Sequence, residues 1–414
     1  MTPEIKQRIE QIRRGEVPEG YVKTALGLAP ANWKRYTFGD IYTERKEPGD
    51  ENLPLLMVSI HSGVSDGEVD GAELPKQVKR IEDKSQYKKA VSGDLVFNMM
   101  RAWQGAIGTV RTTGMVSPAY IVAEPNDKAY PLFMDYYSRT PQMINQIDRQ
   151  SYGVTDFRKR LYWDSFAPIG CILPPIAEQR KIAAILTTQD KVIELKEKQL
   201  AEKQRQKKYL MQQLLTGKKR LPGFSGEWSF PKAKELFQSV SDKDHNGDLA
   251  VLSSTQDRGI VPRVEVDIDI KYDACSLVNY KKVSKGNFVI SLRSFQGGIE
   301  YSAYTGLVSP AYTVLSSRKE MSDGYYKQFF KSTDYINRLN VAVYGIRDGK
   351  QISYEDFGRL QIPYPPIKEQ DAIAEVLSTA DREIELLQQD IEQEKQKKKA
   401  LMQLLLTGIV RVKI

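Results

Sequence analysis

The 414-residue sequence has only two histidines and two cysteines, so it offers few of the side chains that bind zinc or act as a general base. Cys171 and Cys275 imply no disulfide framework, which fits a reducing cytoplasm. No run approaches the roughly 18–20 apolar residues that cross a bilayer, and the polar first residues lack a signal-peptide core. The sequence therefore predicts a cytoplasmic protein without a membrane span.

Motifs that hold nucleotides are also missing. The sequence has no Gly-x-x-x-x-Gly-Lys-Ser/Thr loop, no Gly-x-Gly-x-x-Gly loop and no Asn/Asp-Pro-Pro-aromatic tetrapeptide. Gly217-Lys218 follows a predicted helix instead of a strand and lacks the first glycine of a phosphate loop. We predict a chain that binds without catalysing, with no catalytic residue, no metal site and no cofactor of its own. An enzyme with an unrecognised site is the alternative.

The composition is that of a globular protein, with 41% hydrophobic and 28% charged residues. A chain of this length is too long for one ordinary core and predicts two or three domains. The formal net charge of +8 favours a polyanionic partner without proving one.

A long segment of the chain is present twice. Pro174-Pro175-Ile176-Ala177-Glu178-Gln179 returns 191 residues later as Pro365-Pro366-Ile367-Lys368-Glu369-Gln370. Leu214-Leu215-Thr216-Gly217 returns at the same offset as Leu405-Leu406-Thr407-Gly408. Because the register holds throughout, we interpret the two segments as an internal duplication.

Each copy predicts one long helix. Prolines are tolerated only in a first turn, an acidic residue there suits the helix dipole, and Thr-Gly gives the usual C-terminal cap. Apolar residues recur at alternating steps of three and four, which predicts a heptad seam with the other copy as its simplest partner. The seam residues are Ile182, Leu186, Ile193, Leu200, Leu210, Leu214, Ile373, Leu377, Ile384, Leu387, Ile391, Leu401 and Leu405.

The remaining sequence predicts two similar globular parts. Short strand-like runs such as 55–60, 94–97 and 119–122 alternate with glycine-rich turns, and one helix is predicted over 131–146. Val116-Ser117-Pro118-Ala119-Tyr120 returns as Val308-Ser309-Pro310-Ala311-Tyr312, but here the offset drifts and most residues differ. The globular parts have therefore diverged, while the long helices have not.

These patterns predict an α+β fold with a pseudo-twofold internal repeat. It would consist of two similar mixed α/β domains and two long helices that form an antiparallel coiled coil. The predicted segments are 1–20 (a short N-terminal helical segment), 21–173 (first globular domain), 174–217 (first long helix), 218–364 (second globular domain) and 365–414 (second long helix).

Basic, polar and aromatic residues near predicted strands are candidates for DNA contact, because Arg and Gln read guanine and adenine edges and basic side chains bind phosphates. At each position a solvated loop residue is the alternative. The candidates in the first half are Ser59, His61, Arg101, Trp103, Gln104, Tyr152, Arg158, Lys159 and Arg160. Those in the second half are Ser253, Thr255, Gln256, Arg258, Arg293, Phe295, Gln296, Tyr344, Arg347 and Lys350.

The sequence resembles the specificity subunit of bacterial Type I restriction–modification enzymes. The resemblance depends on the paired Pro-Pro-Ile-x-Glu-Gln helices, their Leu-Leu-Thr-Gly ends and the segment from Arg220 through Leu221-Pro222-Gly223-Phe224 to Trp228. It covers essentially the whole chain. It implies two target-recognition domains, each reading half of a split, asymmetric sequence in double-stranded DNA, with the helices as a spacer.

The resemblance also implies partners. Two methylation subunits would dock on this chain and would use S-adenosylmethionine, and restriction subunits would join them and would use ATP and Mg²⁺. The alternative is a coiled-coil adaptor with two ligand-binding domains that are not specific for DNA. Binding to DNA that is insensitive to salt would favour this adaptor, because phosphate contacts make affinity strongly salt-dependent.

Overall fold

A computed structural model describes residues 2–50, 52–65, 86–153, 158–266, 274–342 and 352–413, with the side chains of 274–276, 295 and 342 left out. The chain divides into two compact units. Unit 1 comprises Met1–Leu195 and Ile391–Ile414, and unit 2 comprises Lys196–Asp390. The predicted segment boundaries lie at the helix ends, whereas each unit takes in half of each long helix, because those halves contact that unit's globular part.

Unit 1 is built around a four-stranded antiparallel sheet. Its strand order is β4 (Tyr42–Arg45), β11 (Tyr120–Pro125), β8 (Leu95–Asn98) and β9 (Ile107–Thr109). Four antiparallel strand pairs surround it, namely β1 (Tyr21–Thr24) with β2 (Gly27–Pro30), β3 (Lys34–Thr37) with β12 (Gly170–Leu173), β5 (Met57–Ser59) with β6 (Gly63–Ser65), and β7 (Lys88–Ala90) with β10 (Gly114–Val116).

The short helices of unit 1 are α1 (Pro3–Arg13), α2 (Phe38–Ile41), η2 (Ala102–Gln104), α3 (Pro131–Tyr137), α4 (Pro141–Gln150) and α5 (Trp163–Phe166). The prediction of one helix over 131–146 was wrong, because the chain forms α3 and α4 there. Pro141 cannot continue a helix, and the Thr140 hydroxyl accepts a hydrogen bond from the Met143 amide to start a new one.

Unit 2 repeats the sheet of unit 1 with the corresponding order β13 (Phe237–Val240), β20 (Thr313–Ser317), β17 (Phe288–Ile290) and β18 (Glu300–Tyr301). Its further strand pairs are β14 (Leu252–Thr255) with β15 (Gly259–Pro262) and β16 (Lys281–Val283) with β19 (Gly306–Val308). Its short helices are α7 (Ala233–Leu236), η4 (Arg263–Glu265), η5 (Ala274–Asn279), α8 (Ser294–Gly297), α9 (Asp323–Phe329), α10 (Thr333–Ala342) and α11 (Tyr354–Arg359).

Each globular part has an aromatic core. In unit 1, Phe166 lies 4.3 Å from Phe38 and 4.7 Å from Phe97, measured between ring centroids. In unit 2, Phe330 lies 5.5 Å from Phe237 and 5.2 Å from Phe288. Burial of these rings, together with the aliphatic residues around them, fixes each sheet against its helices.

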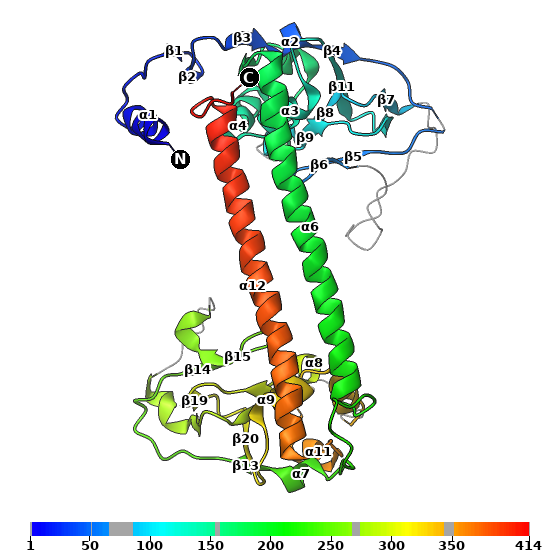
Figure 1. Cartoon of the computed structure of the whole chain (residues 1–414), viewed down its shortest axis with the longest axis vertical. Coiled ribbons are helices and arrows are strands. Elements are labelled where there is room, and N and C mark those ends of the chain that lie inside the picture. Colours follow the sequence, from blue (N-terminus) through cyan, green and yellow to red (C-terminus); the bar gives the residue numbers. More distant parts are fainter. Residues whose placement is uncertain are drawn as a thin grey trace. The chain divides into compact units, whose positions relative to one another are not determined.

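The two long helices are α6 (Ile176–Leu214, 39 residues) and α12 (Ile367–Leu406, 40 residues), shown in green and red-orange in Figure 1. Every predicted seam residue is buried or half-buried. At the ends of the seam these residues join the globular cores. Ile182, Leu186 and Leu405 belong to the core of unit 1, and Leu214, Ile373 and Leu377 belong to that of unit 2.

Polar side chains link α6 to α12 within each unit. In unit 1 the Asp190 carboxylate pairs with Lys398 at 2.5 Å, and the Gln189 amide donates to Glu394 at 2.6 Å. In unit 2 the ion pairs are Lys196–Asp390 at 2.7 Å, Lys203–Glu383 at 2.7 Å, and Lys207–Asp381. In these unit 2 ion pairs the residue numbers rise along α6 while those of their partners on α12 fall. The two helical segments therefore run in opposite directions in unit 2.

A buried glutamate near the start of α6 binds two residues from distant parts of unit 1. Arg411 Nε and Nη2 donate to the Glu178 carboxylate at 2.6 and 2.7 Å, and the Trp33 indole donates at 3.2 Å. The Glu178 side chain is fully buried. The bidentate arginine compensates for the loss of hydration of this carboxylate.

Unit 2 contains the same arrangement near the start of α12. Arg220 Nε and Nη2 donate to the Glu369 carboxylate at 2.5 and 2.6 Å, and the Trp228 indole donates at 2.9 Å. In both units the arginine lies just after the C-terminal end of one long helix, and the glutamate lies in the first turn of the other. We call this set of contacts the glutamate clamp.

A second repeated contact fixes each globular part to a long helix. Tyr136 of α3 donates to Asp190 at 2.6 Å, and Gln328 of α9 donates to Asp381 at 2.6 Å. Burial and the Asp190 carboxylate raise the pKa of the Tyr136 hydroxyl above its ordinary value. These aspartates also form the Lys398 and Lys207 ion pairs, so each one joins three elements of its unit.

We expect Arg411→Met to lower the free energy of unfolding of unit 1 by about 3 kcal/mol, because it leaves the buried Glu178 carboxylate without its ionic partner. Denaturant unfolding of the variant measures this change. The matched control is Arg14→Met, since Arg14 forms an exposed ion pair with Glu16 and should contribute less than about 1 kcal/mol. Equal effects of the two changes would contradict the stabilising role of the clamp.

Candidate nucleic-acid interface

Three segments of unit 1 that carry predicted DNA-contact residues come together. The turn between β5 and β6 carries Ser59 and His61, and Gly105 at the end of η2 lies against Ile60 of this turn. The main chain of Leu161 donates to the Met99 carbonyl at 2.8 Å, which places the segment with Arg158, Lys159 and Arg160 beside the loop that precedes η2. α4 contacts η2 and, through Asp148, Lys159, while β8 and β9 of the sheet contact the β5–β6 hairpin.

Residues of η2 form the centre of this surface. Arg101 and Gln104 are exposed, and Trp103 is half-buried with its indole donating to the Met100 carbonyl at 3.0 Å. The Lys159 ammonium lies 5.5 Å from the Trp103 ring centroid and pairs with Asp148 at 2.8 Å. The geometry leaves Arg101 and Gln104 projecting from a helical turn that Trp103 anchors.

The segment around Tyr152 forms the edge of the same surface. Tyr152 and Arg160 exchange two backbone hydrogen bonds of 3.1 and 2.9 Å, which close a short loop. The Tyr152 side chain is 60% exposed, and its ring lies 6.0 Å from that of Tyr162. Arg158 and Arg160 are exposed as well. An exposed aromatic ring and exposed arginines in one segment suit contact with a sugar–phosphate backbone or a base.

Unit 2 brings two corresponding segments together. The turn between β14 and β15 carries Gln256 and Arg258, both exposed, while Arg293 precedes α8 and Gln296 lies within it, and both are exposed. A side chain at Gly297 of α8 would place its Cβ 2.9 Å from Gln256 Cγ, so the turn and α8 are in direct contact. Each unit thus combines a hairpin turn with a short helical loop.

Three predicted residues have turn-forming roles in the structure. The Ser59 hydroxyl accepts from the His61 amide at 3.1 Å, and the Thr255 hydroxyl donates to the Gly259 carbonyl at 2.9 Å. The Ser253 hydroxyl accepts from Arg263 Nε at 3.2 Å. These contacts shape the turns from which the neighbouring side chains project. The other predicted candidates Tyr344, Arg347 and Lys350, and the side chain of Phe295, lie outside the described residues.

Sequence reasoning missed two cations beneath these surfaces. Arg139 follows α3 and its guanidinium donates to the His61 carbonyl in the β5–β6 turn. Lys331 follows α9 and its ammonium donates to the Gln256 carbonyl at 3.1 Å. Arg139 and Lys331 are 192 residues apart and so occupy equivalent positions of the globular repeat. That equivalence was the one signal in the sequence that could have identified them.

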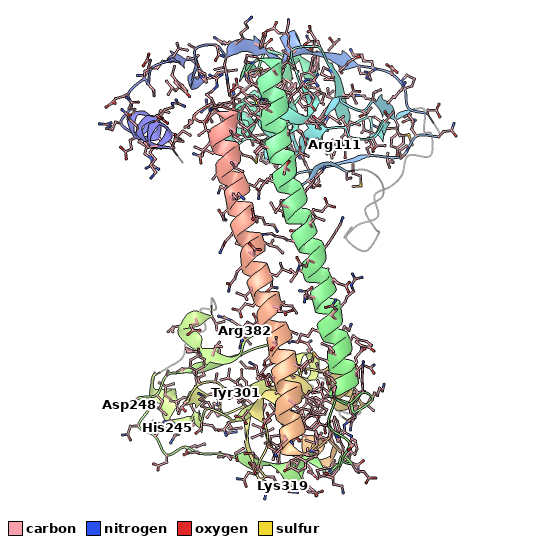
Figure 2. The ribbon with its side chains drawn as sticks, in the orientation of Figure 1. Arg111, His245, Asp248, Tyr301, Lys319 and Arg382 are labelled. Atoms are coloured by element: carbon pink, nitrogen blue, oxygen red, sulfur yellow. The ribbon has the colours of Figure 1, made fainter. Side chains whose placement is uncertain are left out.

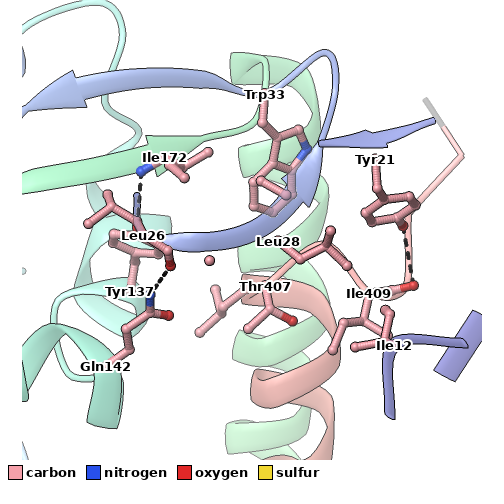
Figure 3. A pocket seen from close by; sticks show the side chains of 13 residues that line it. Ile12, Tyr21, Leu26, Leu28, Trp33, Tyr137, Gln142, Ile172, Thr407 and Ile409 are labelled. Atoms are coloured by element: carbon pink, nitrogen blue, oxygen red, sulfur yellow. Dashed lines mark hydrogen bonds between the residues drawn. The ribbon is translucent and has the colours of Figure 1, made fainter. Parts of the chain in front are cut away.

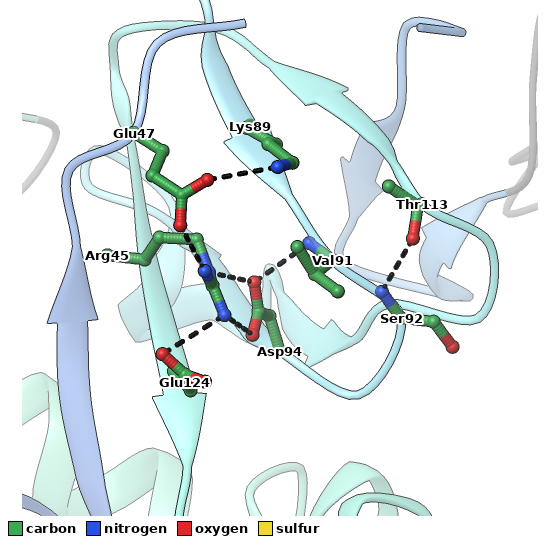
Figure 4. A network of polar contacts seen from close by, with 8 residues as sticks. All are labelled: Arg45, Glu47, Lys89, Val91, Ser92, Asp94, Thr113 and Glu124. Carbon is green, nitrogen blue, oxygen red and sulfur yellow. Dashed lines mark hydrogen bonds and ion pairs between the residues drawn. The ribbon is translucent and has the colours of Figure 1, made fainter.

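Other basic residues of unit 1 are used inside the protein. Arg45 donates to Asp94 at 2.8 Å and pairs with Glu47 and with Glu124 at 3.1 Å (Figure 4). Burial raises the pKa of the Asp94 carboxyl, and hydrogen bonds from Arg45 and the Val91 amide oppose the change. Arg111, labelled in Figure 2, pairs with Asp135 at 2.7 Å. These arginines contribute to the fold and leave less charge for DNA.

A pocket of about 310 Å³ in unit 1 lies where β1 and β2 meet the end of α12 (Figure 3). Its lining is largely apolar and includes Leu26, Leu28, Trp33 and Ile409. Tyr21 donates to the Gly408 carbonyl at 2.6 Å beside it. It has no cluster of titratable groups, and no group of three or more metal-binding side chains occurs among the described residues.

Comparison with known proteins shows which proteins this chain is similar to. Residues 208–396 match the family described as the Type I restriction modification DNA specificity domain. A putative type I restriction enzyme MjaX specificity subunit from Methanocaldococcus jannaschii is 25% identical, covering 95% of this chain and 97% of the relative. The chain is similar to Type I specificity subunits over nearly its whole length. These matches indicate a DNA specificity subunit of a Type I restriction–modification system.

Further relatives agree over nearly the whole chain. The MjaVIII specificity subunit of the same organism is 24% identical across 93% of this chain and 94% of its own. The HsdS subunit from Thermoanaerobacter tengcongensis has a similar fold, with 20% identity, a TM-score of 0.50, and coverage of 92% of this chain and 98% of that chain. The S subunit from M. genitalium aligns with a TM-score of 0.53 and 12% identity, over 90% and 96% of the two chains.

The mixed α/β content predicted for this chain matches that of these solved structures. None of the described helices has a stretch long and apolar enough to cross a membrane.

We expect Arg101→Ala and Arg293→Ala each to weaken binding to target DNA by about 5- to 100-fold, the range for loss of one good base contact. Fluorescence anisotropy at fixed salt measures the affinity of the assembled complex. Arg359→Ala is the control, because Arg359 is exposed on α11 and pairs with Glu355. Unchanged affinity in both test variants would remove these arginines from the interface.

Proposed function

We propose that each globular part of this specificity subunit is a target-recognition domain that reads one half of a bipartite, asymmetric DNA sequence. The observation that carries the proposal is that each unit presents a hairpin turn beside a short helical loop, and that the two turns differ. The turn is Ile60-His61-Ser62 in unit 1 and Gln256-Asp257-Arg258 in unit 2, while Arg and Gln recur at equivalent positions of the helical loops. Different turn side chains on a shared framework suit the reading of two unrelated half-sites.

We further propose that α6 and α12 form an antiparallel coiled coil that sets the gap between the half-sites. Support comes from the buried seam residues and from the ion pairs that link the two helices within each unit. A helix of 39 residues is about 58 Å long at 1.5 Å per residue. That length exceeds one turn of B-DNA, about 34 Å, and would suit two separated half-sites.

The chemistry is proposed to belong to partner proteins. Two methylation subunits would dock on the conserved long helices and would supply the S-adenosylmethionine site. Restriction subunits would join this complex and would supply the site for ATP and Mg²⁺. The specificity subunit itself would be non-catalytic and would act in the cytoplasm. The two long helices share about half of their residues at a constant offset, whereas the globular domains have diverged further, and this supports a pair of similar docking sites.

Methylation mapping tests the proposal directly. The specificity subunit is expressed with its methylation subunit, and modified bases are located across the host genome. A split, asymmetric motif that appears only with this chain would support the proposal. A complex that assembles and binds S-adenosylmethionine but adds no methylation would favour the adaptor alternative.

We expect replacement of residues 222–362 with the corresponding domain of another family member to change one half-site and leave the other intact. The physical reason is that the cores of the two globular parts are separate clusters of residues. Methylation mapping of the chimaera gives both half-sites. Loss of both in a folded, assembled chimaera would refute modular recognition.

We expect deletion of seven residues from each long helix, 195–201 and 386–392, to shorten the gap by about three base pairs. Seven residues keep the heptad register and remove about 10 Å of helix, and stacked base pairs are about 3.4 Å apart. Mapping of the methylated motif measures the gap and the half-sites together. Deletion from one helix alone is the control, because it leaves the two helices unequal in length and shifts the facing residues by one heptad. An unchanged gap in the double deletion would contradict the spacer role.

A further inference from the structure

The structure assigns a positioning role to Lys331, which we infer ties the two DNA-reading loops of unit 2 into one rigid surface. This inference rests on the proposed recognition of a half-site by unit 2. Lys331 lies in the turn between α9 and α10, below the β14–β15 turn and α8. No motif in the sequence around Lys331 marks this residue as functional.

The ammonium group of Lys331 contacts both loops at once. It donates to the Gln256 carbonyl at 3.1 Å and to the Gly297 carbonyl at 2.9 Å. It also pairs with the Glu300 carboxylate at the start of β18. A lysine ammonium has three protons, and these three acceptors use all of them. No donor is left over for a phosphate, so the arrangement suits positioning instead of direct DNA contact.

The Glu300 carboxylate holds the Lys331 ammonium in place through their ion pair. Its side chain is 2% exposed, and its second carboxylate oxygen has no hydrogen-bond partner among the described residues. Burial raises the pKa of the Glu300 carboxyl to about 7, while the Lys331 charge acts in the opposite direction. Without Lys331 the pKa would rise further, so the carboxyl would be protonated at neutral pH and the variant would bury no unpaired charge.

Backbone contacts show how closely the loops approach this lysine. Gly298, at φ +81°, would place a Cβ 2.0 Å from the Phe330 carbonyl oxygen. Gly259, at φ +79°, would place a Cβ 2.7 Å from the carbonyl oxygen of Tyr301, which follows Glu300 and is labelled in Figure 2. α8 therefore packs directly on the turn that carries Lys331, and the β14–β15 turn packs on β18. A small displacement of Lys331 would move both reading loops.

Unit 1 has one part of this arrangement, the contact between a cation and the hairpin turn. Arg139, the repeat equivalent of Lys331, donates to the His61 carbonyl of the β5–β6 turn. The position equivalent to Glu300 is Gly108, which carries no side chain. The acidic partner is therefore particular to unit 2. Substitutions of Lys331 and Arg139 should act on opposite half-sites, and substitution of Glu300 should act on one alone.

The test uses the assembled methylation complex and the target mapped for the unaltered chain. We expect Lys331→Met to weaken binding by about tenfold and to reduce discrimination against base changes in one half-site only, as for loss of one charged hydrogen bond. We expect Arg139→Met to do so for the other half-site. Affinity is measured over a series of salt concentrations with oligonucleotides altered in each half-site.

The salt series separates positioning from direct contact. A side chain that binds phosphate lowers the slope of log affinity against log salt by about 0.9 when removed. For Lys331→Met we expect the slope to stay unchanged while half-site discrimination falls. A reduced slope with intact discrimination would overturn the inference and make Lys331 a phosphate contact.

A second variant keeps the inference falsifiable if Lys331→Met does not fold. Glu300→Gln retains the size of the side chain and removes its charge, so we expect a smaller loss of discrimination in the same half-site. If folded Glu300→Gln discriminates as well as the unaltered chain, the inference is overturned. It is also overturned if the variant loses discrimination in the other half-site. The unaltered complex is assayed in parallel, and a lack of half-site discrimination there would instead refute the proposed function.

Discussion

The buried carboxylates of Glu178 and Glu369 are the constraint on which the rest of the structure depends. Each lies in the first turn of a long helix, where the helix dipole already favours a negative charge. A buried carboxylate is unfavourable without a partner, and an arginine beyond the C-terminal end of the other long helix supplies it. The glutamate clamp therefore fixes where one helix starts and where the other ends within each unit.

The two clamps explain why both long helices keep a glutamate in their first turn. Glu178, Arg411 and Trp33 in unit 1 correspond to Glu369, Arg220 and Trp228 in unit 2, and a change in any of them would leave a buried donor or acceptor unsatisfied. The aspartates that bind Tyr136 and Gln328 add the same type of constraint further along each helix. The exposed loops carry no such constraint, so their side chains can differ between the units and between targets.

Recognition and support are divided between different residues. The exposed side chains of η2, α8 and the hairpin turns are the candidates for contact with bases. Arg139 and Lys331 lie beneath them and bind backbone carbonyls, which fixes the loops without specifying their side chains. This division allows a recognition surface to change its sequence while its supports stay in place. Lys331 adds a buried carboxylate to that support, which unit 1 does not have at the equivalent position.

The sequence by itself determined the duplication, the long helices and the family resemblance, because helical periodicity and proline and glycine signals are local along the chain. It also indicated which exposed residue types could contact DNA. The break at Thr140-Pro141 was a local signal that the apolar periodicity concealed. Only the tertiary structure brought Arg411 to Glu178, and Lys331 to Gln256, Gly297 and Glu300. Those contacts join residues distant in the sequence, and no spacing rule within one copy relates them.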